Sequence, residues 1–159
     1  MAQISEAVDM PYTTALVYPA ALSAPSRKKW LIAGSGDGAA VREALRFSDT
    51  ERVVLVEISK TVVQETQELV PSFWNGAQND PRLEIVYADV FRYIRESREL
   101  FDIILLDLTD PADDFHTPFR RSAADPLYAR DALQPFVDRL TPAGVLTAQA
   151  QELSDLRSA

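Results

Sequence analysis

Acidic side chains stand at or just beyond the ends of several predicted β-strands, where they could bind a positively charged ligand. These residues are Asp37, Glu57, Asp89, Asp107 and Asp110. An open α/β sheet binds its ligands at the carboxyl ends of its strands. A row of carboxylates at that edge favours a cationic ligand that is rich in hydrogen-bond donors and disfavours a bare phosphate.

The loop Gly34–Ala39 has the sequence G-S-G-D-G-A and fits two classes of ligand. It satisfies the G-x-G-x-x-G/A dinucleotide fingerprint, and Glu57 follows about twenty residues later, where a ribose-binding acid belongs. A dinucleotide would place its pyrophosphate against this loop, where the carboxylate of Asp37 would repel it. A sulfonium ligand, such as S-adenosylmethionine or a relative, would instead be attracted. The alternative interpretation is that the loop is a tight turn that binds no ligand.

The remaining acids suggest how such a ligand could be bound and used. Glu57 could accept hydrogen bonds from both ribose hydroxyls, and Asp89 could accept the adenine amino group or could simply cap a helix. Asp107 and Asp110 follow a fully apolar segment. One of them could accept a proton from an amine while the other binds a cationic group. An Asx-type turn closed by Pro111 is the alternative for this pair.

Composition excludes several classes of function. The chain has 159 residues, which is about one domain, with a net charge of −8 and a pI of about 4.6. Nucleic acid is therefore not an expected partner. The absence of cysteine excludes disulfides and thiolate chemistry. No metal-ligand spacing, membrane-spanning run or signal peptide is apparent, so we expect a cytoplasmic protein without metal.

Strand and helix patterns alternate along the chain. Strands are predicted over 29–33, 52–58, 83–87, 101–106 and 145–148, and helices over 39–47, 60–70, 90–98 and 127–140. We expect a loop over 71–82, a kink at Pro135 and a turn at Thr141–Gly144. The prediction is an α/β fold, a Rossmann-like parallel sheet with helices on both faces and strand order 3-2-1-4-5.

The expected organisation has three parts: a lead-in over residues 1–27, a Rossmann-like nucleoside-binding domain over 28–150 and a tail over 151–159. The sheet is expected to stop after its fifth strand. An uncovered edge strand favours association, so a homo-oligomer is also expected.

From about Tyr12 to Gln149 the sequence resembles the polyamine aminopropyltransferases, the spermidine synthase family. The matching segments are Gly34–Gly38 with Arg42-Glu43, Val56–Ile58, Asp80–Arg82, Ala88-Asp89, Asp107–Pro111, Leu127-Tyr128 and Pro142–Leu146. It departs from the family pattern at Thr13-Thr14, Ser35, Ser59 and Ala143. The resemblance implies a fold like that of class I S-adenosylmethionine-dependent methyltransferases, without the family's N-terminal β-rich domain and C-terminal end.

The resemblance also implies a reaction in polyamine biosynthesis. Decarboxylated S-adenosylmethionine would act as co-substrate, with no tightly bound cofactor, and would donate its aminopropyl group to a diamine such as putrescine. By position, Asp37 would hold the aminopropyl end, Glu57 the ribose and Asp89 the adenine, with Gly34, Gly36, Gly38 and Ile58 in the same donor site. Asp107 would be the general base, Asp110 would bind the diamine and Tyr12 would lie on the substrate side.

Three rival functions remain open from the sequence. A methyltransferase would use intact S-adenosylmethionine on the same fold, and a non-catalytic nucleoside-binding module would bind without turnover. A dinucleotide oxidoreductase is disfavoured by the carboxylate of Asp37.

Overall fold

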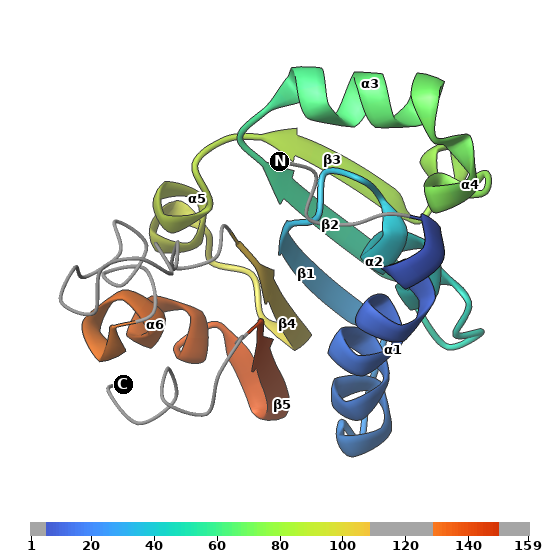
Figure 1. The fold of residues 1–159 in the computed structure, drawn as a ribbon. Helices are drawn as coiled ribbons and strands as arrows, with labels where there is room; N and C mark the ends of the chain where they lie inside the picture. The colour runs from blue at the N-terminus through green and yellow to red at the C-terminus, as the bar shows by residue number, and fades with distance from the viewer. Residues whose placement is uncertain (1–5, 109–128, 150–159) are drawn as a thin grey trace, which may run out of the picture.

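A parallel sheet of five strands forms the centre of the computed structural model, which describes residues 6–108 and 129–149 (Figure 1). Its strands are β1 (Lys29–Gly34), β2 (Arg52–Glu57), β3 (Leu83–Tyr87), β4 (Phe101–Asp107) and β5 (Leu140–Ala148). They are arranged in the order β3-β2-β1-β4-β5, and all neighbours run parallel. Both the parallel sheet and its predicted order are confirmed.

Helices cover both faces of this sheet. They are α1 (Glu6–Ser23), α2 (Ala39–Leu45), α3 (Lys60–Leu69), α4 (Pro71–Trp74), the short 3-10 helix η1 (Ala77–Asn79), α5 (Val90–Glu96) and α6 (Arg130–Val137). Apolar residues of α1, α2, α3 and α4 pack in one core against the sheet. The helices α5 and α6 pack in a second core on the opposite face. None of the described helices combines the length and apolar character needed to cross a membrane.

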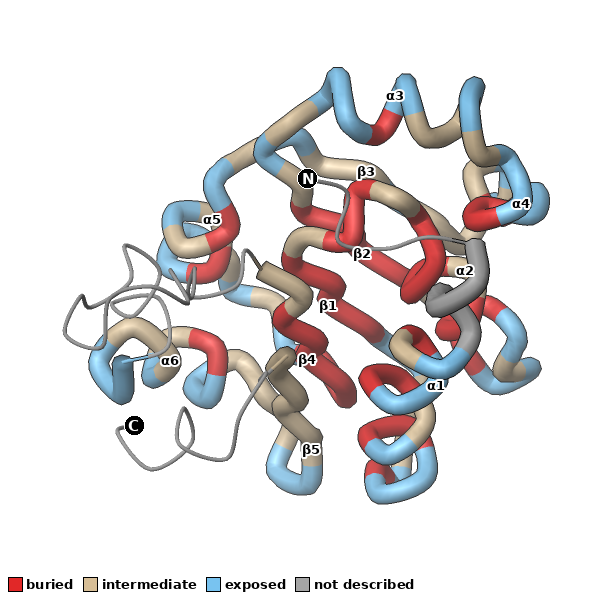
Figure 2. Tube along the Cα trace, viewed as in Figure 1, coloured by how far each residue is buried: buried red, intermediate tan, exposed pale blue. Residues whose placement is uncertain are grey.

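The central strands are apolar throughout because both of their faces are covered. In β1, Trp30 and Ile32 point into one core while Leu31 and Ala33 point into the other, and all four are fully buried. Every residue of β4 from Phe101 to Leu106 is buried as well. Figure 2 shows this concentration of buried residues along β1, β2 and β4.

The predicted lead-in contributes to the same core as the sheet. Helix α1 buries Leu16, Val17, Ala20 and Ala21 in the cluster that also contains Trp30 of β1. The predicted boundary at residue 27 therefore marks a change of element within a shared core, and the three-part division of the chain remains a prediction.

The prediction of a plain loop over residues 71–82 is wrong, because this segment contains α4 and η1. Pro71 stops α3 but also opens α4, a position where its missing N–H costs no hydrogen bond. Asn75 and Gly76 then take left-handed backbone conformations that end one short helix and begin the next. The Asn-Gly turn signal was correct, but it marked the junction between two helices.

The end of the described chain also differs from the prediction. The helix expected over 127–140 ends at Val137, and Pro135 lies inside α6 without ending it. Leu140 instead starts β5 by pairing with Phe101 of β4. The turn expected at Thr141–Gly144 interrupts the β4–β5 ladder inside β5, where the register shifts. The pairing with β4 resumes after this interruption, so the segment behaves as a bulge.

One glycine determines how closely two strand ends approach. Gly34 ends β1 with a φ of 79° and pairs with Asp107 at the end of β4. A Cβ atom on Gly34 would lie 2.0 Å from the backbone oxygen of Asp107. Only glycine therefore fits at this point, for reasons of both conformation and space.

We predict that Gly34→Ala lowers the free energy of unfolding by at least about 2 kcal/mol, because strain and a backbone clash add together. Gly76→Ala is a matched control, since Gly76 has a φ of 86° but no atom within 4 Å of an added Cβ. Gly76→Ala should lower the free energy of unfolding by only about 1–2 kcal/mol. Urea unfolding of both variants measures the difference, and equal losses would contradict the close approach of β1 and β4.

Candidate functional site at the carboxyl ends of the strands

The carboxyl ends of β1, β2 and β4 and the start of α5 surround a cavity of about 250 Å³. Its lining comprises Gly34, Val56, Glu57, Ile58, Ala88, Asp89, Val90, Phe91, Asp107 and Leu108. Half of the ten site residues predicted from the sequence are thus in one place: Gly34, Glu57, Ile58, Asp89 and Asp107. The strand-end location agrees with the expectation for an open α/β sheet.

The glycine loop begins at the cavity with Gly34, whereas Asp37 in the same loop is not among the lining residues. The Asp37 Oδ1 atom accepts hydrogen bonds from the backbone N–H of Ala39 at 3.0 Å and from the hydroxyl of Ser35 at 3.2 Å. Asp37 therefore stands at the amino end of α2, where the helix dipole favours a negative charge. Ser35 has a φ of 59°, which lies in the left-handed region. Glycine adopts this backbone conformation with less strain than serine does.

Glu57 ends β2 with its carboxylate against the glycine loop. Its Oε1 atom accepts a hydrogen bond from the backbone N–H of Ser59 at 2.8 Å. A Cβ atom added to Gly36 would lie 3.1 Å from Glu57 Oε2, so the loop passes directly over this carboxylate. The next residue, Ile58, lines the cavity with 75% of its surface exposed. An acceptor and an exposed apolar side chain thus stand side by side.

Asp89 caps a helix and also lines the cavity. Its Oδ1 atom accepts hydrogen bonds from the backbone N–H groups of Phe91 at 2.7 Å and Arg92 at 3.1 Å, so it caps α5. The same residue lines the cavity. Both cap bonds go to Oδ1, so capping does not occupy the second carboxylate oxygen.

Asp107 and Tyr12 are brought together although 95 positions separate them in sequence. The hydroxyl of Tyr12 on α1 donates a hydrogen bond to Asp107 Oδ1 at 2.5 Å. This distance is typical of a hydroxyl bonded to a charged carboxylate. Asp110, which was predicted to bind the second substrate, lies outside the described residues.

A buried ion cluster on α2 was not predicted as part of the site. The Glu43 side chain on α2 is fully buried and accepts hydrogen bonds from Arg42, Arg46 and Tyr18. Burial raises the pKa of Glu43, but bonds from Arg42 and Tyr18 and the two positive charges outweigh it and hold that pKa below its ordinary value. The cluster ties α2 to α1 through Tyr18. Its only signal in the sequence was the Arg42-Glu43 pair.

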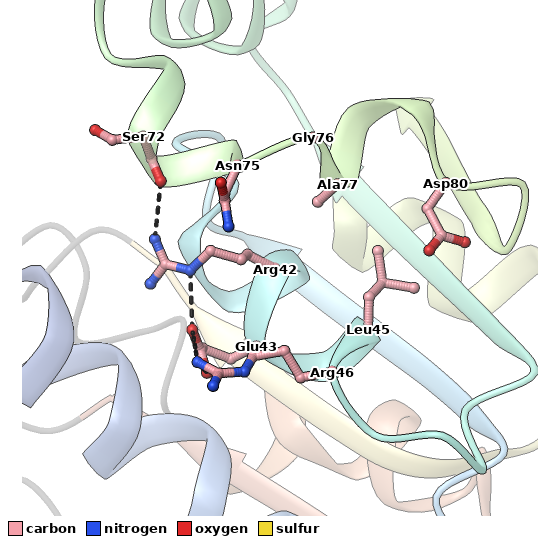
Figure 3. Close-up of a pocket in the computed structure, with 9 residues that line it drawn as sticks. All are labelled: Arg42, Glu43, Leu45, Arg46, Ser72, Asn75, Gly76, Ala77 and Asp80. Carbon is pink, nitrogen blue, oxygen red and sulfur yellow. Dashed lines mark hydrogen bonds and ion pairs between the residues drawn. The ribbon is translucent and has the colours of Figure 1, made fainter.

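A larger cavity, of about 730 Å³, lies between α2 and the segment from Ser72 to Asp80 (Figure 3). The charged groups that line it bind protein groups: Glu43 is bonded to Arg42 and Arg46, and Asp80 to Arg82. It contains none of the strand-end carboxylates. We therefore assign the candidate site to the smaller cavity. Within the described part of the chain, no group of three or more His, Cys, Asp or Glu side chains could hold a metal ion.

Comparison with known proteins identifies relatives of this arrangement. A family model described as the spermine/spermidine synthase domain matches residues 9–155. A polyamine aminopropyltransferase of Aeropyrum pernix is 36% identical over 155 residues, which are 97% of this chain and 47% of that protein. The chain thus spans about half the length of this relative.

Solved structures agree with the sequence comparison. The spermidine synthase of Thermotoga maritima matches with a TM-score of 0.74 at 30% identity, over 89% of this chain and 44% of that chain. A spermidine synthase in complex with the transition state analogue AdoDATO also has a TM-score of 0.74, at 31% identity, over 86% of this chain and 44% of that chain.

Proposed function

Because the chain belongs to the spermine/spermidine synthase family, we propose that its strand-end cavity binds decarboxylated S-adenosylmethionine. The proposed activity is transfer of the aminopropyl group to a diamine such as putrescine. The observation that supports it best is the convergence of Glu57, Asp89 and Asp107 on one cavity beside the loop that carries Asp37. Since the chain covers about half of its relatives, this activity remains a proposal for the chain itself.

The charge of the donor matches the charges of the site. Decarboxylated S-adenosylmethionine carries a sulfonium and an ammonium group but no carboxylate. Asp37 would attract the ammonium end of this donor and would repel the carboxylate of intact S-adenosylmethionine. Hydrogen bonds from Ala39 and Ser35 hold the carboxylate of Asp37 in place before a ligand arrives.

The nucleoside part of the donor would lie across the ends of β2 and β3. Glu57 would accept hydrogen bonds from the ribose hydroxyls, and Asp89 would accept the adenine amino group while it continues to cap α5. The exposed side chain of Ile58 would pack against the flat face of the base. Gly34, Gly36 and Gly38 would let the loop pack tightly against Asp107, Glu57 and Trp74 and so set the path of its backbone beside the ligand.

Asp107 would act as the general base. An amine attacks carbon only through its neutral form, so the proton of the acceptor's ammonium group would pass to Asp107. The nitrogen lone pair would form a bond to the carbon next to the sulfonium, and the carbon–sulfur bond would break with its electrons moving to sulfur. Methylthioadenosine would leave, and the new amine would carry the aminopropyl group.

Tyr12 would orient the base, because its hydroxyl already donates to Asp107 Oδ1. Asp110 would bind the other end of the diamine. A homo-oligomer and a cytoplasmic location complete the proposal, and both rest on the sequence alone.

A methyltransferase that uses intact S-adenosylmethionine is the second candidate, because the same sheet and the same ribose-binding acid would serve it. Preference between the two donors separates these functions.

We predict that calorimetric titration of the wild-type chain shows at least tenfold tighter binding of decarboxylated than of intact S-adenosylmethionine. Asp37→Asn should bring the two affinities to within about threefold, since one charge–charge contact supplies on the order of 1 kcal/mol of the difference. Asp138→Asn removes an equal charge from the exposed end of α6 and serves as the control. Equal affinities in the wild type would favour the methyltransferase, and binding of neither donor would refute the proposal.

We predict that Asp107→Asn slows release of methylthioadenosine from donor and putrescine by at least 100-fold, the usual contribution of a general base. Tyr12→Phe keeps the ring and removes the hydrogen bond to Asp107, so it should slow the reaction less. A chromatographic product assay measures all three rates. A wild-type rate in Asp107→Asn would remove Asp107 from the mechanism, and no product from the wild type would mean that this chain alone is inactive.

A further inference from the structure

The glycine loop rests on two side chains that no sequence motif indicated, Thr66 of α3 and Trp74 of α4. The hydroxyl of Thr66 donates a hydrogen bond to the backbone oxygen of Gly36 at 2.9 Å. The indole Nε1–H of Trp74 donates in turn to Thr66 Oγ1 at 3.1 Å. Two hydrogen bonds in series therefore connect the buried indole to the middle of the loop.

The indole ring also fills the space directly behind the loop. Trp74 is fully buried, and a Cβ atom on Gly38 would lie 2.1 Å from its ring. Gly38 has a φ of 83°, so its left-handed conformation and its contact with the ring both require glycine. Trp74 thus holds the loop by packing at Gly38 and, through Thr66, by hydrogen bonding at Gly36.

The Thr66 hydroxyl has one proton and two possible acceptors. The backbone oxygen of Val63, in the same helix, lies at 3.1 Å and that of Gly36 lies at 2.9 Å. The indole N–H occupies a lone pair of the hydroxyl oxygen, which polarises its O–H group and strengthens the bond that it donates. The shorter contact is the one that leads to the loop.

The orientation of one peptide group follows from this contact. A trans peptide points its C=O and its N–H in opposite directions. With the Gly36 oxygen turned toward Thr66, the N–H of Asp37 must point away from α3. Gly36 also lies against the carboxylate of Glu57. A rotation of this peptide would therefore also disturb Glu57, the proposed hydrogen-bond acceptor for the ribose.

Helix α4 is itself fixed to the loop's own helix. Arg42 of α2 donates from Nη1 to the backbone oxygens of Phe73 at 3.0 Å and Ser72 at 3.3 Å, as Figure 3 shows for Ser72. Arg42 is in turn bonded to the buried Glu43. The contacts form a closed path from the loop through α2 to α4 and back through Thr66, so Trp74 cannot move without the loop.

We propose that Thr66 and Trp74 are positioning residues that hold the Gly34–Ala39 loop in its donor-binding conformation. Neither side chain would touch the substrate. The expected effect on donor affinity rests on the proposed function, whereas the expected effect on the ligand-free loop does not.

The test replaces Thr66 with valine, which keeps the shape of the side chain and removes its hydroxyl. We expect Thr66→Val to bind decarboxylated S-adenosylmethionine about tenfold more weakly, because the Gly36 oxygen and the indole N–H both lose a partner. Thr66→Ser should restore the affinity. Thr61→Val makes the same change at an exposed site in α3 and should leave the affinity unaltered.

Amide hydrogen exchange of the ligand-free protein provides the independent readout. The Gly38 N–H is bonded to the Ser35 oxygen at 2.9 Å, so its exchange reports directly on the loop. Thr66→Val should speed exchange at Gly38 about tenfold while amides of β4 keep their wild-type rates. Trp74→Phe, which keeps a ring but lacks the N–H, should do the same.

The outcomes separate the two proposals. If the wild type binds no donor, the proposed function fails and exchange at Gly38 alone decides the role of Thr66. Unchanged exchange at Gly38 in Thr66→Val would overturn the inference, whatever the donor affinity. Faster exchange throughout β4 as well would also overturn it, because the residue would then support the whole fold.

Discussion

The approach of β1 to β4 at their carboxyl ends, with no room for a side chain between them, is the constraint on which the site depends. Gly34 permits it, because any Cβ atom there would overlap the backbone oxygen of Asp107. The contact places the start of the glycine loop beside the proposed general base. A sheet in which these strands lay further apart would separate the proposed donor site from the proposed general base.

The acids around the cavity are held by the fold itself. Asp37 stands at the amino end of α2, Asp89 caps α5, and Glu57 accepts the backbone N–H that follows its own strand. Each carboxylate is thus oriented by hydrogen bonds that form when the sheet and helices form. Electrostatic groups that are oriented in advance need little rearrangement when charge develops, which is the usual source of catalytic advantage. Helix capping and the proposed ligand binding would therefore use the same side chains.

The sequence predicted the strands and their order because β1, β2 and β4 are apolar runs that end at glycines or acids. It also located Gly34, Glu57 and Asp107 at the strand ends. It missed α4, since Pro71 and the Asn-Gly pair indicate a loop when read locally. It also missed that β5 begins at Leu140, before the turn predicted at Thr141–Gly144. Tyr12 and Asp107 are in contact although 95 positions separate them in the sequence, and no local sequence pattern predicts such a contact. Trp74 was missed for a related reason: its role depends on the space behind Gly38.

The central claim is that a cationic nucleoside binds at the strand-end cavity, and backbone amide NMR with decarboxylated S-adenosylmethionine tests it most directly. The account predicts that the largest chemical-shift changes fall in Gly34–Ala39, at Glu57 and Ile58, and from Ala88 to Val90. Changes centred on the cavity between Arg46 and Asp80, or changes absent from all of these segments at saturating donor, would contradict it.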